Sequence, residues 1–137
     1  TTINRLSPIK ILDDVLTVDV TGYFGFGGLA IKKDGSLWGW GTSWGGYLGL
    51  GMDSGEVLRP TKLMDDVADI SVSDVHCMVI KKDGSLWAWG DNVYGQTGNG
   101  WDLNSLQDGS GTRHFAYPVK IMDDVMRVSA NNVGAWL

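Results

Sequence analysis

An all-β fold of β-propeller blades, each with four short antiparallel strands, is predicted by three observations. The octapeptide at residues 31–38 returns letter for letter at residues 80–87. Twenty glycines in 137 residues separate short apolar runs, which is typical of strands joined by tight turns. No stretch shows a sustained helical period. Self-similarity at about 50 residues, with four short strands in each unit, is typical of propeller blades.

A second repeated segment divides the chain. It begins at Pro8, Pro60 and Pro118 and continues each time with a lysine, two aspartates and a valine. We treat residues 1–137 as a single propeller fragment with repeats 8–59 and 60–117 and a partial repeat 118–137. The chain therefore holds about two and a half blades.

Each element of a blade has its own signal. Val15–Val20 and Val67–Val72 are rich in β-branched residues and are expected to be strands. Asp-Gly at 34–35 and at 83–84 predicts tight hairpin turns with glycine at positive φ. The paired strands would be 29–31 with 37–40, and 78–80 with 86–89. The Pro-x-Lys segments, including Ile9 to Leu12 of the first copy, should give another strand, with proline at its start because it lacks an N–H.

The second copy carries a family pattern. Residues 83–98 read Asp-Gly-Ser-Leu-Trp-Ala-Trp-Gly-Asp-Asn-Val-Tyr-Gly-Gln-Thr-Gly. This resembles the repeat of the regulator of chromosome condensation family, which has a dGs-l-W-x-W-G core and an N-x-x-G-Q-x-G turn. The first copy departs from it, with Thr42 and Ser43 in place of Asp-Asn and Tyr47 in place of the glutamine. The resemblance implies a seven-bladed β-propeller.

The resemblance also implies a class of function. Relatives include a guanine-nucleotide exchange factor that also binds chromatin, and a bacterial-type propeller, secreted, that inhibits β-lactamases. Both kinds bind other proteins through propeller rims and faces. We therefore expect a non-enzymatic protein-interaction module within a larger or oligomeric propeller, with a protein partner of unknown identity. The alternatives are an enzyme-inhibitor propeller, a carbohydrate-binding lectin and an exchange factor for a small GTPase.

Composition narrows the partners and the location. Sixteen acidic residues against 11 basic ones disfavour nucleic acid as a partner. No apolar run reaches the roughly 18 residues of a membrane span. The lone Cys77 cannot form an intrachain disulfide, so the compartment stays open, with a secreted or cell-surface location favoured over a cytoplasmic one.

Several short motifs that suggest chemistry lack the structural context that they need. Ser43 lies in Gly-x-Ser-x-Gly, but it aligns with Asn92 in a repeat turn, whereas a nucleophile elbow needs a strand-to-helix turn. Residues 25–30 fit a dinucleotide fingerprint, but a hairpin follows instead of a helix. His76, Cys77 and His114 are too scattered for a zinc site. We therefore predict no catalytic residue, no metal and no cofactor, and we expect the paired aspartates to be turn residues.

The aromatic residues fall into two groups. Trp38, Trp40, Trp87 and Trp89 recur at strand spacing and are expected to pack within the blades. Aromatic residues in turns and around the insertion at 100–117 could instead bind a partner, because Tyr and Trp dominate interface hot spots; they could equally fold the loop back onto its blade. The candidate binding residues are Trp44, Tyr47, Tyr94, Trp101, His114, Phe115 and Tyr117.

The ends of so short an array raise a further expectation. A stack of fewer than three blades exposes sheet faces and unpaired strands that soluble monomers rarely leave open. We expect either self-association, with Ile9 to Leu12 and Trp136-Leu137 packing on a neighbouring chain, or completion by further blades.

Overall fold

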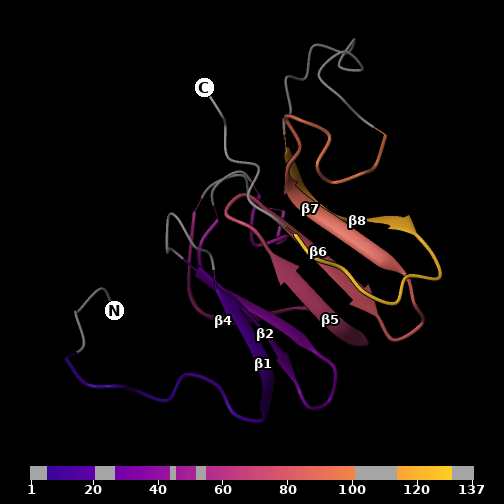
Figure 1. Ribbon diagram of the computed structural model, residues 1–137. Coiled ribbons are helices and arrows are strands. Elements are labelled where there is room, and N and C mark those ends of the chain that lie inside the picture. The colour runs from indigo at the N-terminus through magenta and orange to yellow at the C-terminus, as the bar shows by residue number, and fades with distance from the viewer. Residues whose placement is uncertain (1–5, 21–26, 44–45, 52–54, 101–113, 131–137) are drawn as a thin grey trace.

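The fold is all-β, as predicted. The computed structural model describes residues 6–20, 27–43, 46–51, 55–100 and 114–130. They form two sheets of four antiparallel strands, with the orders β1-β2-β3-β4 and β5-β6-β7-β8 (Figure 1). We call these sheets blade 1 and blade 2. Their strands are β1 (Val15–Val20), β2 (Gly27–Lys32), β3 (Leu37–Thr42), β4 (Glu56–Met64), β5 (Val67–Val72), β6 (His76–Lys81), β7 (Leu86–Asp91) and β8 (His114–Met122).

The central hairpin of each blade has the predicted register. Leu29 pairs with Gly39 in blade 1, and Val79 pairs with Trp87 in blade 2. The turn glycines Gly35 and Gly84 have φ values of 86° and 83°, which confirms the Asp-Gly turns. Glycine suits these positions because a Cβ disfavours positive φ.

A chain of hydrogen bonds holds each hairpin turn. The Asp83 carboxylate accepts from the backbone N–H of Ser85 at 3.0 Å and from its hydroxyl at 2.6 Å. The indole nitrogen of Trp87 donates to the Ser85 oxygen at 2.9 Å. Asp34, Ser36 and Trp38 repeat these contacts in blade 1. The repeated octapeptide is therefore a turn-forming element.

The paired aspartates lie in turns, as predicted. The second aspartate of each pair adopts the left-handed conformation that Asp tolerates better than most residues, and the first pairs with a lysine three residues earlier. The left-handed residues are Asp14 (56°), Asp66 (62°) and Asp124 (60°). The ion pairs are Lys10–Asp13 (2.8 Å), Lys62–Asp65 (2.6 Å) and Lys120–Asp123 (2.8 Å). Because these pairs are exposed, each contributes little to stability.

The predicted position of proline in the fourth strand is wrong. Pro60 lies in the interior of β4 and Pro118 in the interior of β8. Near each proline, the register of pairing with the third strand shifts. The shift lies between Gly39 and Gly41 in blade 1 and between Ala88 and Gly90 in blade 2. Proline lacks a backbone N–H, but an outermost strand with a local register shift can do without that hydrogen bond.

The prediction of a strand from Ile9 to Leu12 is also wrong. These residues form no strand, and the Ile9 and Ile11 side chains are exposed. The corresponding segments of β4 and β8 each pair with the third strand that precedes them in the chain. No described third strand precedes Ile9, so the segment has no edge on which to form a ladder. In β4 and in β8, the Pro-x-Lys segment belongs to the sheet that precedes it in the chain.

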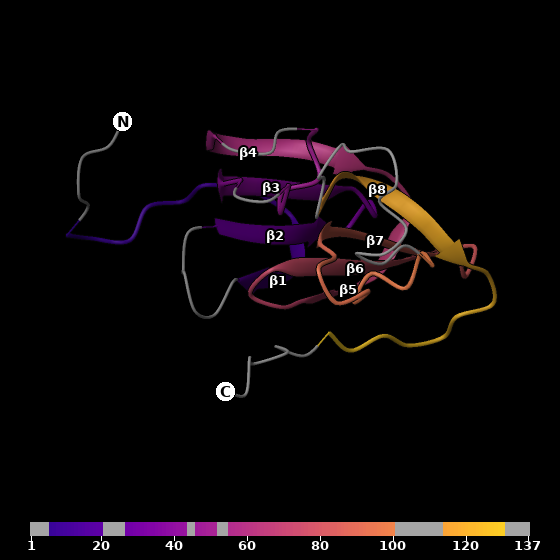
Figure 2. The ribbon, with the colours of Figure 1, turned by 90° about the horizontal axis from the view of Figure 1, so that it is seen from above.

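The two blades pack through a core that both supply. β1 and β5 lie side by side, and the backbone N–H of Val72 donates to the Asp19 carboxylate at 3.2 Å (Figures 1 and 2). Trp89 is fully buried, whereas Trp38, Trp40 and Trp87 are half-buried. The core cluster consists of Leu29, Ile31, Leu37, Tyr47, Leu48, Val67, Cys77, Val79 and Trp89.

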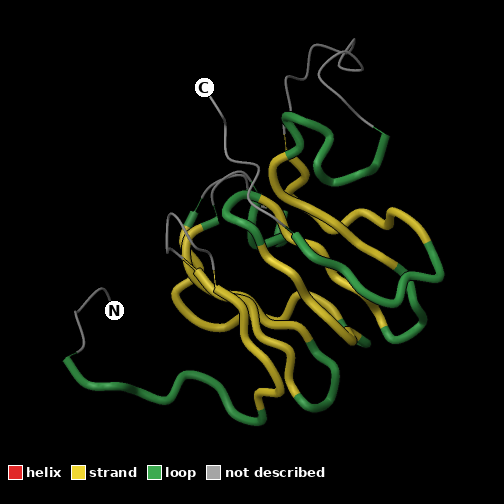
Figure 3. Tube along the Cα trace, in the orientation of Figure 1, coloured by secondary structure: helices red, strands yellow, loops and turns green. Residues whose placement is uncertain are grey.

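The backbone contains only strands, turns and irregular connections over the described ranges (Figure 3). In that part of the chain, no helix of membrane-spanning length and apolarity occurs.

Candidate functional site

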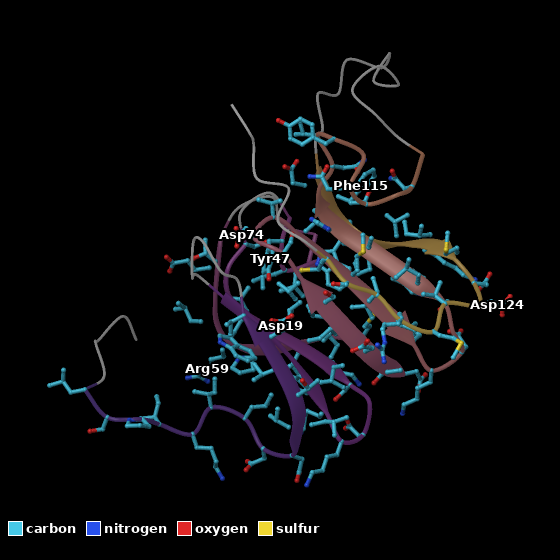
Figure 4. The ribbon with its side chains drawn as sticks, in the orientation of Figure 1. Asp19, Tyr47, Arg59, Asp74, Phe115 and Asp124 are labelled. Carbon is cyan, nitrogen blue, oxygen red and sulfur yellow. The ribbon has the colours of Figure 1, made fainter. Side chains whose placement is uncertain are left out.

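The connections between strands gather at two ends of the blades. One end, which we call the hairpin end, carries the Asp-Gly and Asp-Asp turns. The other end carries the remaining connections and the start of β8; we call its described parts, residues 46–51, 73–75, 92–100 and 114–117, the loop rim. Phe115 and Asp124 lie at these two opposite ends of blade 2 (Figure 4). The loop rim includes the predicted binding residues that the structure describes.

Turn 46–51 of blade 1 joins the two blades. The carbonyl oxygen of Tyr47 accepts from the indole nitrogen of Trp89 at 2.8 Å and from the thiol of Cys77 at 3.5 Å. The backbone N–H of Gly51 donates to the carbonyl oxygen of Ala116 in β8 at 2.7 Å. These three contacts place the turn of one blade directly on the second, third and fourth strands of the next.

Glycine is needed in turn 46–51 because the next blade approaches so closely. A Cβ on Gly49 would lie 2.9 Å from the Trp89 indole nitrogen, and one on Gly46 would lie 2.6 Å from the Cα of Ala116. Both distances are shorter than real Cβ contacts allow. Sequence reasoning missed this role. The available signal was the shared spacing of glycines at 46, 49 and 51 and at 95, 98 and 100.

Tyr47 lies between the blades rather than on the surface (Figure 4). Only 4% of the residue is exposed, so its ring packs in the core of the described chain. Burial raises the pKa of the Tyr47 phenol far above its usual value, and the nearby Cys77, Asp19 and Asp74 add to this shift. Its hydroxyl oxygen is buried with no hydrogen-bond partner among the described residues.

The remaining predicted binding residues take different positions. Tyr94 is 71% exposed at the tip of a turn, and Tyr117 is 66% exposed on β8. Phe115 is half-buried and packs against the core cluster. The His114 backbone pairs with Asp91, while Trp44 and Trp101 lie outside the described residues.

The two exposed tyrosines both lie on structured backbone. The Tyr94 N–H donates to the Gln96 side-chain oxygen at 2.8 Å, and the Gly95 N–H donates to the Asn92 carbonyl oxygen at 3.1 Å. The Tyr117 ring lies so close over Gly51 that any Cβ there would overlap it. The loop rim therefore presents two phenol rings from positions that the fold determines.

Ser43, His76 and Cys77, which suggested chemistry in the sequence, are all buried. Ser43 is fully buried, and its N–H donates to the Gly55 carbonyl oxygen at 2.7 Å. His76 shares a 2.7 Å hydrogen bond with the Ser73 hydroxyl, and burial lowers the pKa of its imidazole. Burial raises the pKa of the Cys77 thiol well above its usual value, so the thiolate is disfavoured. No group of three or more possible metal ligands occurs among the described residues.

Comparisons with known proteins agree with this geometry. Residues 67–96, from the start of β5 to the turn after β7, match the family model described as Regulator of chromosome condensation (RCC1) repeat. No curated protein matches the sequence. Among solved structures, human WBSCR16 is 24% identical with a TM-score of 0.63, over 86% of this chain and 28% of that one.

Two yeast structures resemble this chain to a comparable degree. Yeast RCC1 (Prp20) with Kap60 bound is 21% identical with a TM-score of 0.67, over 86% of this chain and 28% of that one. Prp20p from Saccharomyces cerevisiae is 22% identical with a TM-score of 0.67, over 85% of this chain and 29% of that one. At this identity the likeness shows the fold, and this chain spans less than a third of those proteins. The special likeness to β-lactamase inhibitors stays a prediction. Residues 67–96 of this chain therefore match an RCC1 repeat, and its two four-stranded blades have the fold of RCC1-like β-propellers.

Proposed function

We propose that this chain is a non-enzymatic protein-interaction module that binds a protein partner through the loop rim of its blades. The observation that carries the proposal is the exposure of Tyr94 and Tyr117 on backbone that the fold holds in place. Tyrosine offers a large, rigid contact area with few rotatable bonds, and it is enriched in binding hot spots.

The local structure lowers the cost of binding at Tyr94. The Asp91 carboxylate accepts from the Val93 N–H at 3.1 Å, so the turn is held on both sides of the tyrosine. A partner that contacts this turn would not have to order it first. Preorganisation of this kind increases affinity because less conformational entropy is lost on association.

Tyr117 gains its position from the other blade. Its ring lies over Gly51 of turn 46–51, so blade 1 supports a side chain that belongs to blade 2. A surface formed by both blades exists only while they are packed together. Binding through Tyr117 would therefore depend on the blade interface as well as on the tyrosine itself.

The similar proteins support a binding role by analogy. One of the solved structures is of yeast RCC1 bound to Kap60, and another concerns the binding of Prp20p to Gsp1p and histones. The buried Ser43 supports the non-enzymatic part of the proposal, because a nucleophile must reach its substrate.

The test compares what the immobilised protein and its variants retain from an extract, with cross-linking to identify the retained proteins. Tyr94→Ala and Tyr117→Ala should each weaken retention of a specific protein about tenfold or more, because a hot-spot residue contributes about 2 kcal/mol. Trp101→Ala tests the aromatic residue at the start of the insertion in the same way. Circular dichroism should show an unchanged fold for all three.

Met122→Ala is the matched control. Met122 is also an exposed apolar side chain of β8, but it lies at the end of the strand nearer the hairpin end. It should retain the partner as the unchanged protein does. Retention that is insensitive to both tyrosine changes would exclude the loop rim as the binding surface.

A further inference from the structure

One titratable side chain of blade 2 is buried beside a connection of the loop rim. His76 begins β6, only 3% of the residue is exposed, and its Nδ1 atom lies 2.7 Å from the hydroxyl oxygen of Ser73. In blade 1, Gly27 holds the equivalent place, since Gly27 pairs with Gly41 as His76 pairs with Gly90. A blade of this repeat therefore forms without an imidazole at this position.

The Ser73 hydroxyl uses all of its hydrogen-bonding capacity. A hydroxyl has one proton to donate and two lone pairs with which to accept. The Ser73 oxygen accepts from the backbone N–H of His76 at 3.0 Å and from that of Val75 at 3.3 Å. Its proton has two acceptors within reach, the His76 Nδ1 atom at 2.7 Å and the His76 carbonyl oxygen at 3.1 Å. This set of contacts suits a neutral imidazole whose Nδ1 atom carries no proton.

Protonation of His76 would overload the Ser73 oxygen. Both ring nitrogens of an imidazolium carry a proton, so Nδ1 would become a third donor toward this oxygen. Two lone pairs cannot serve three donors, and the longest existing contact, from the Val75 N–H, is the one that would be lost. The serine proton would turn to the His76 carbonyl oxygen. The connection 73–75 thus has a different hydrogen-bond pattern for each charge state of His76.

The same connection holds the end of β7, from which the Tyr94 turn begins. The Asp91 N–H donates to the Val75 carbonyl oxygen at 2.8 Å, and the Asp91 carboxylate accepts from the Val93 N–H at 3.1 Å. The two backbones are in close contact, because a Cβ on Gly90 would lie 2.5 Å from the Val75 carbonyl oxygen. A displacement of Val75 therefore acts on the Tyr94 turn through Asp91.

Asp91 is also the ionisable group whose charge acts on His76. Burial lowers the pKa of the His76 imidazole below its ordinary value of about 6.5, and the negative charge of Asp91 opposes this shift in part. Asp74 belongs to the same connection, and Cys77 follows His76 on the opposite face of β6, where its thiol donates to the Tyr47 carbonyl oxygen. An imidazolium would attract the Asp91 carboxylate away from the turn that it now supports.

We propose that Ser73, His76 and Asp91 form a pH-sensitive latch, which holds the Tyr94 turn while His76 is neutral and releases it when His76 is protonated. This regulation rests on the proposed function, because the latch acts on a tyrosine of the loop-rim binding surface. Histidine is the side chain whose charge changes most readily near neutral pH.

The direction of the pH effect follows from the contacts of the latch. The closed latch disfavours the imidazolium, so the released state takes up the proton more readily than the closed state does. The latch is therefore complete above about pH 6.5 and is lost as the pH falls below that value. Binding through Tyr94 should weaken in acid as a result.

NMR spectra of the full chain, recorded between about pH 7.5 and about pH 5, test the latch without a partner. The chemical shifts of the Val93 and Tyr94 amides should change with the same midpoint as those of the His76 imidazole, because a single protonation alters both. This comparison uses the unchanged protein, so it does not depend on the folding of any variant.

His76→Asn gives the decisive comparison. The asparagine oxygen can accept from the Ser73 hydroxyl as the neutral ring nitrogen does, but it does not take up a proton in this pH range. The Val93 and Tyr94 amide shifts should then be independent of pH. His114→Asn is the matched control, since His114 is the other histidine of the chain, and its Tyr94 amide should titrate as in the unchanged protein.

Asp91→Asn tests the coupling from the other side. Loss of the Asp91 charge should lower the midpoint of the His76 ring, and the Tyr94 amide should move to the same lower midpoint. Retention of the partner is then measured at about pH 7.5 and about pH 5.5. The unchanged protein should retain about fivefold less or lower still at the more acidic pH, as expected for a typical coupling between sites, whereas His76→Asn should retain equal amounts.

Two NMR results would overturn the latch. They are a Tyr94 amide that does not titrate with His76, and a Tyr94 titration that persists in His76→Asn. Equal retention by the unchanged protein at both pH values would overturn the effect of the latch on binding. If Tyr94→Ala left retention unchanged, the loop-rim proposal would fail, while the NMR shifts would still decide the latch.

Discussion

The indole nitrogen of Trp89 donates to the carbonyl oxygen of Tyr47 across 2.8 Å, and this bond links the third strand of blade 2 to a turn of blade 1. Both groups are buried. Water cannot replace either partner, so the bond matters more than an exposed one would. The bond also holds Trp89 close to Gly49, at a distance that only a glycine permits.

Trp89→Phe should destabilise the protein more than Trp40→Phe does. Trp40 holds the equivalent place in blade 1, but it is half-buried, and no preceding blade covers it among the described residues. Loss of the Trp89 indole leaves the Tyr47 carbonyl without its nitrogen donor, at a cost of about 1–3 kcal/mol. Urea denaturation of both variants measures the difference. Equal losses of stability would mean that both result from the smaller ring alone, and that the hydrogen bond between the blades contributes nothing.

Tyr47→Phe should leave stability unchanged or raise it. The Tyr47 hydroxyl is buried with no partner in the described structure, so its removal relieves the cost of dehydrating a polar group. The phenylalanine ring keeps the packing between the blades. We expect a gain of up to about 1 kcal/mol, measured by urea or thermal denaturation. A clear loss of stability would show that the hydroxyl has a partner in solution.

Asp83→Asn should lower stability near neutral pH, with a smaller effect in acid. The side-chain and backbone hydrogen bonds from Ser85 lower the pKa of the Asp83 carboxyl. A group whose pKa is lower in the folded state stabilises the fold above its unfolded pKa, about 3.9 for Asp, and the contribution is lost as pH falls through the folded pKa. Melting temperatures of the two proteins should therefore converge below about pH 4.

Glu56→Gln is the control for that comparison, because Glu56 is an exposed carboxylate outside the hairpin turns. Its melting curve should follow that of the unchanged protein throughout the pH range. A constant difference between Asp83→Asn and the unchanged protein down to pH 2 would show that the charge of Asp83 is not what supports the turn.

Much of the local structure could be predicted from the sequence because its causes lie within a few residues. The Asp-Gly-Ser turns form through contacts between residues two apart, such as Asp83 with Ser85. The strands β2, β3, β6 and β7 follow because a tight turn sets the register of its own hairpin. Because the repeated residues are identical, the local structure that forms in one copy is expected in the other as well.

The candidate site was predicted only in part. Tyr94 and Tyr117 are exposed on the loop rim, whereas Tyr47, chosen for the same reason, lies in the core. An aromatic residue in a turn gives no sign of whether another blade will cover it. Trp44 and Trp101 lie outside the described residues, so their part in binding stays a prediction.

The turns of each blade, the register of its hairpins and its repetition follow from the order of the residues, because these features depend on near neighbours in the chain. Which surfaces are covered depends on how the blades pack. Val67 is 2% exposed and its equivalent Val15 is 36% exposed, although both begin the first strand of a blade. The difference arises because blade 1 packs against Val67, while no described blade packs against Val15. Burial in a stack of repeats depends on the neighbouring unit, and a residue's own sequence context does not contain that information.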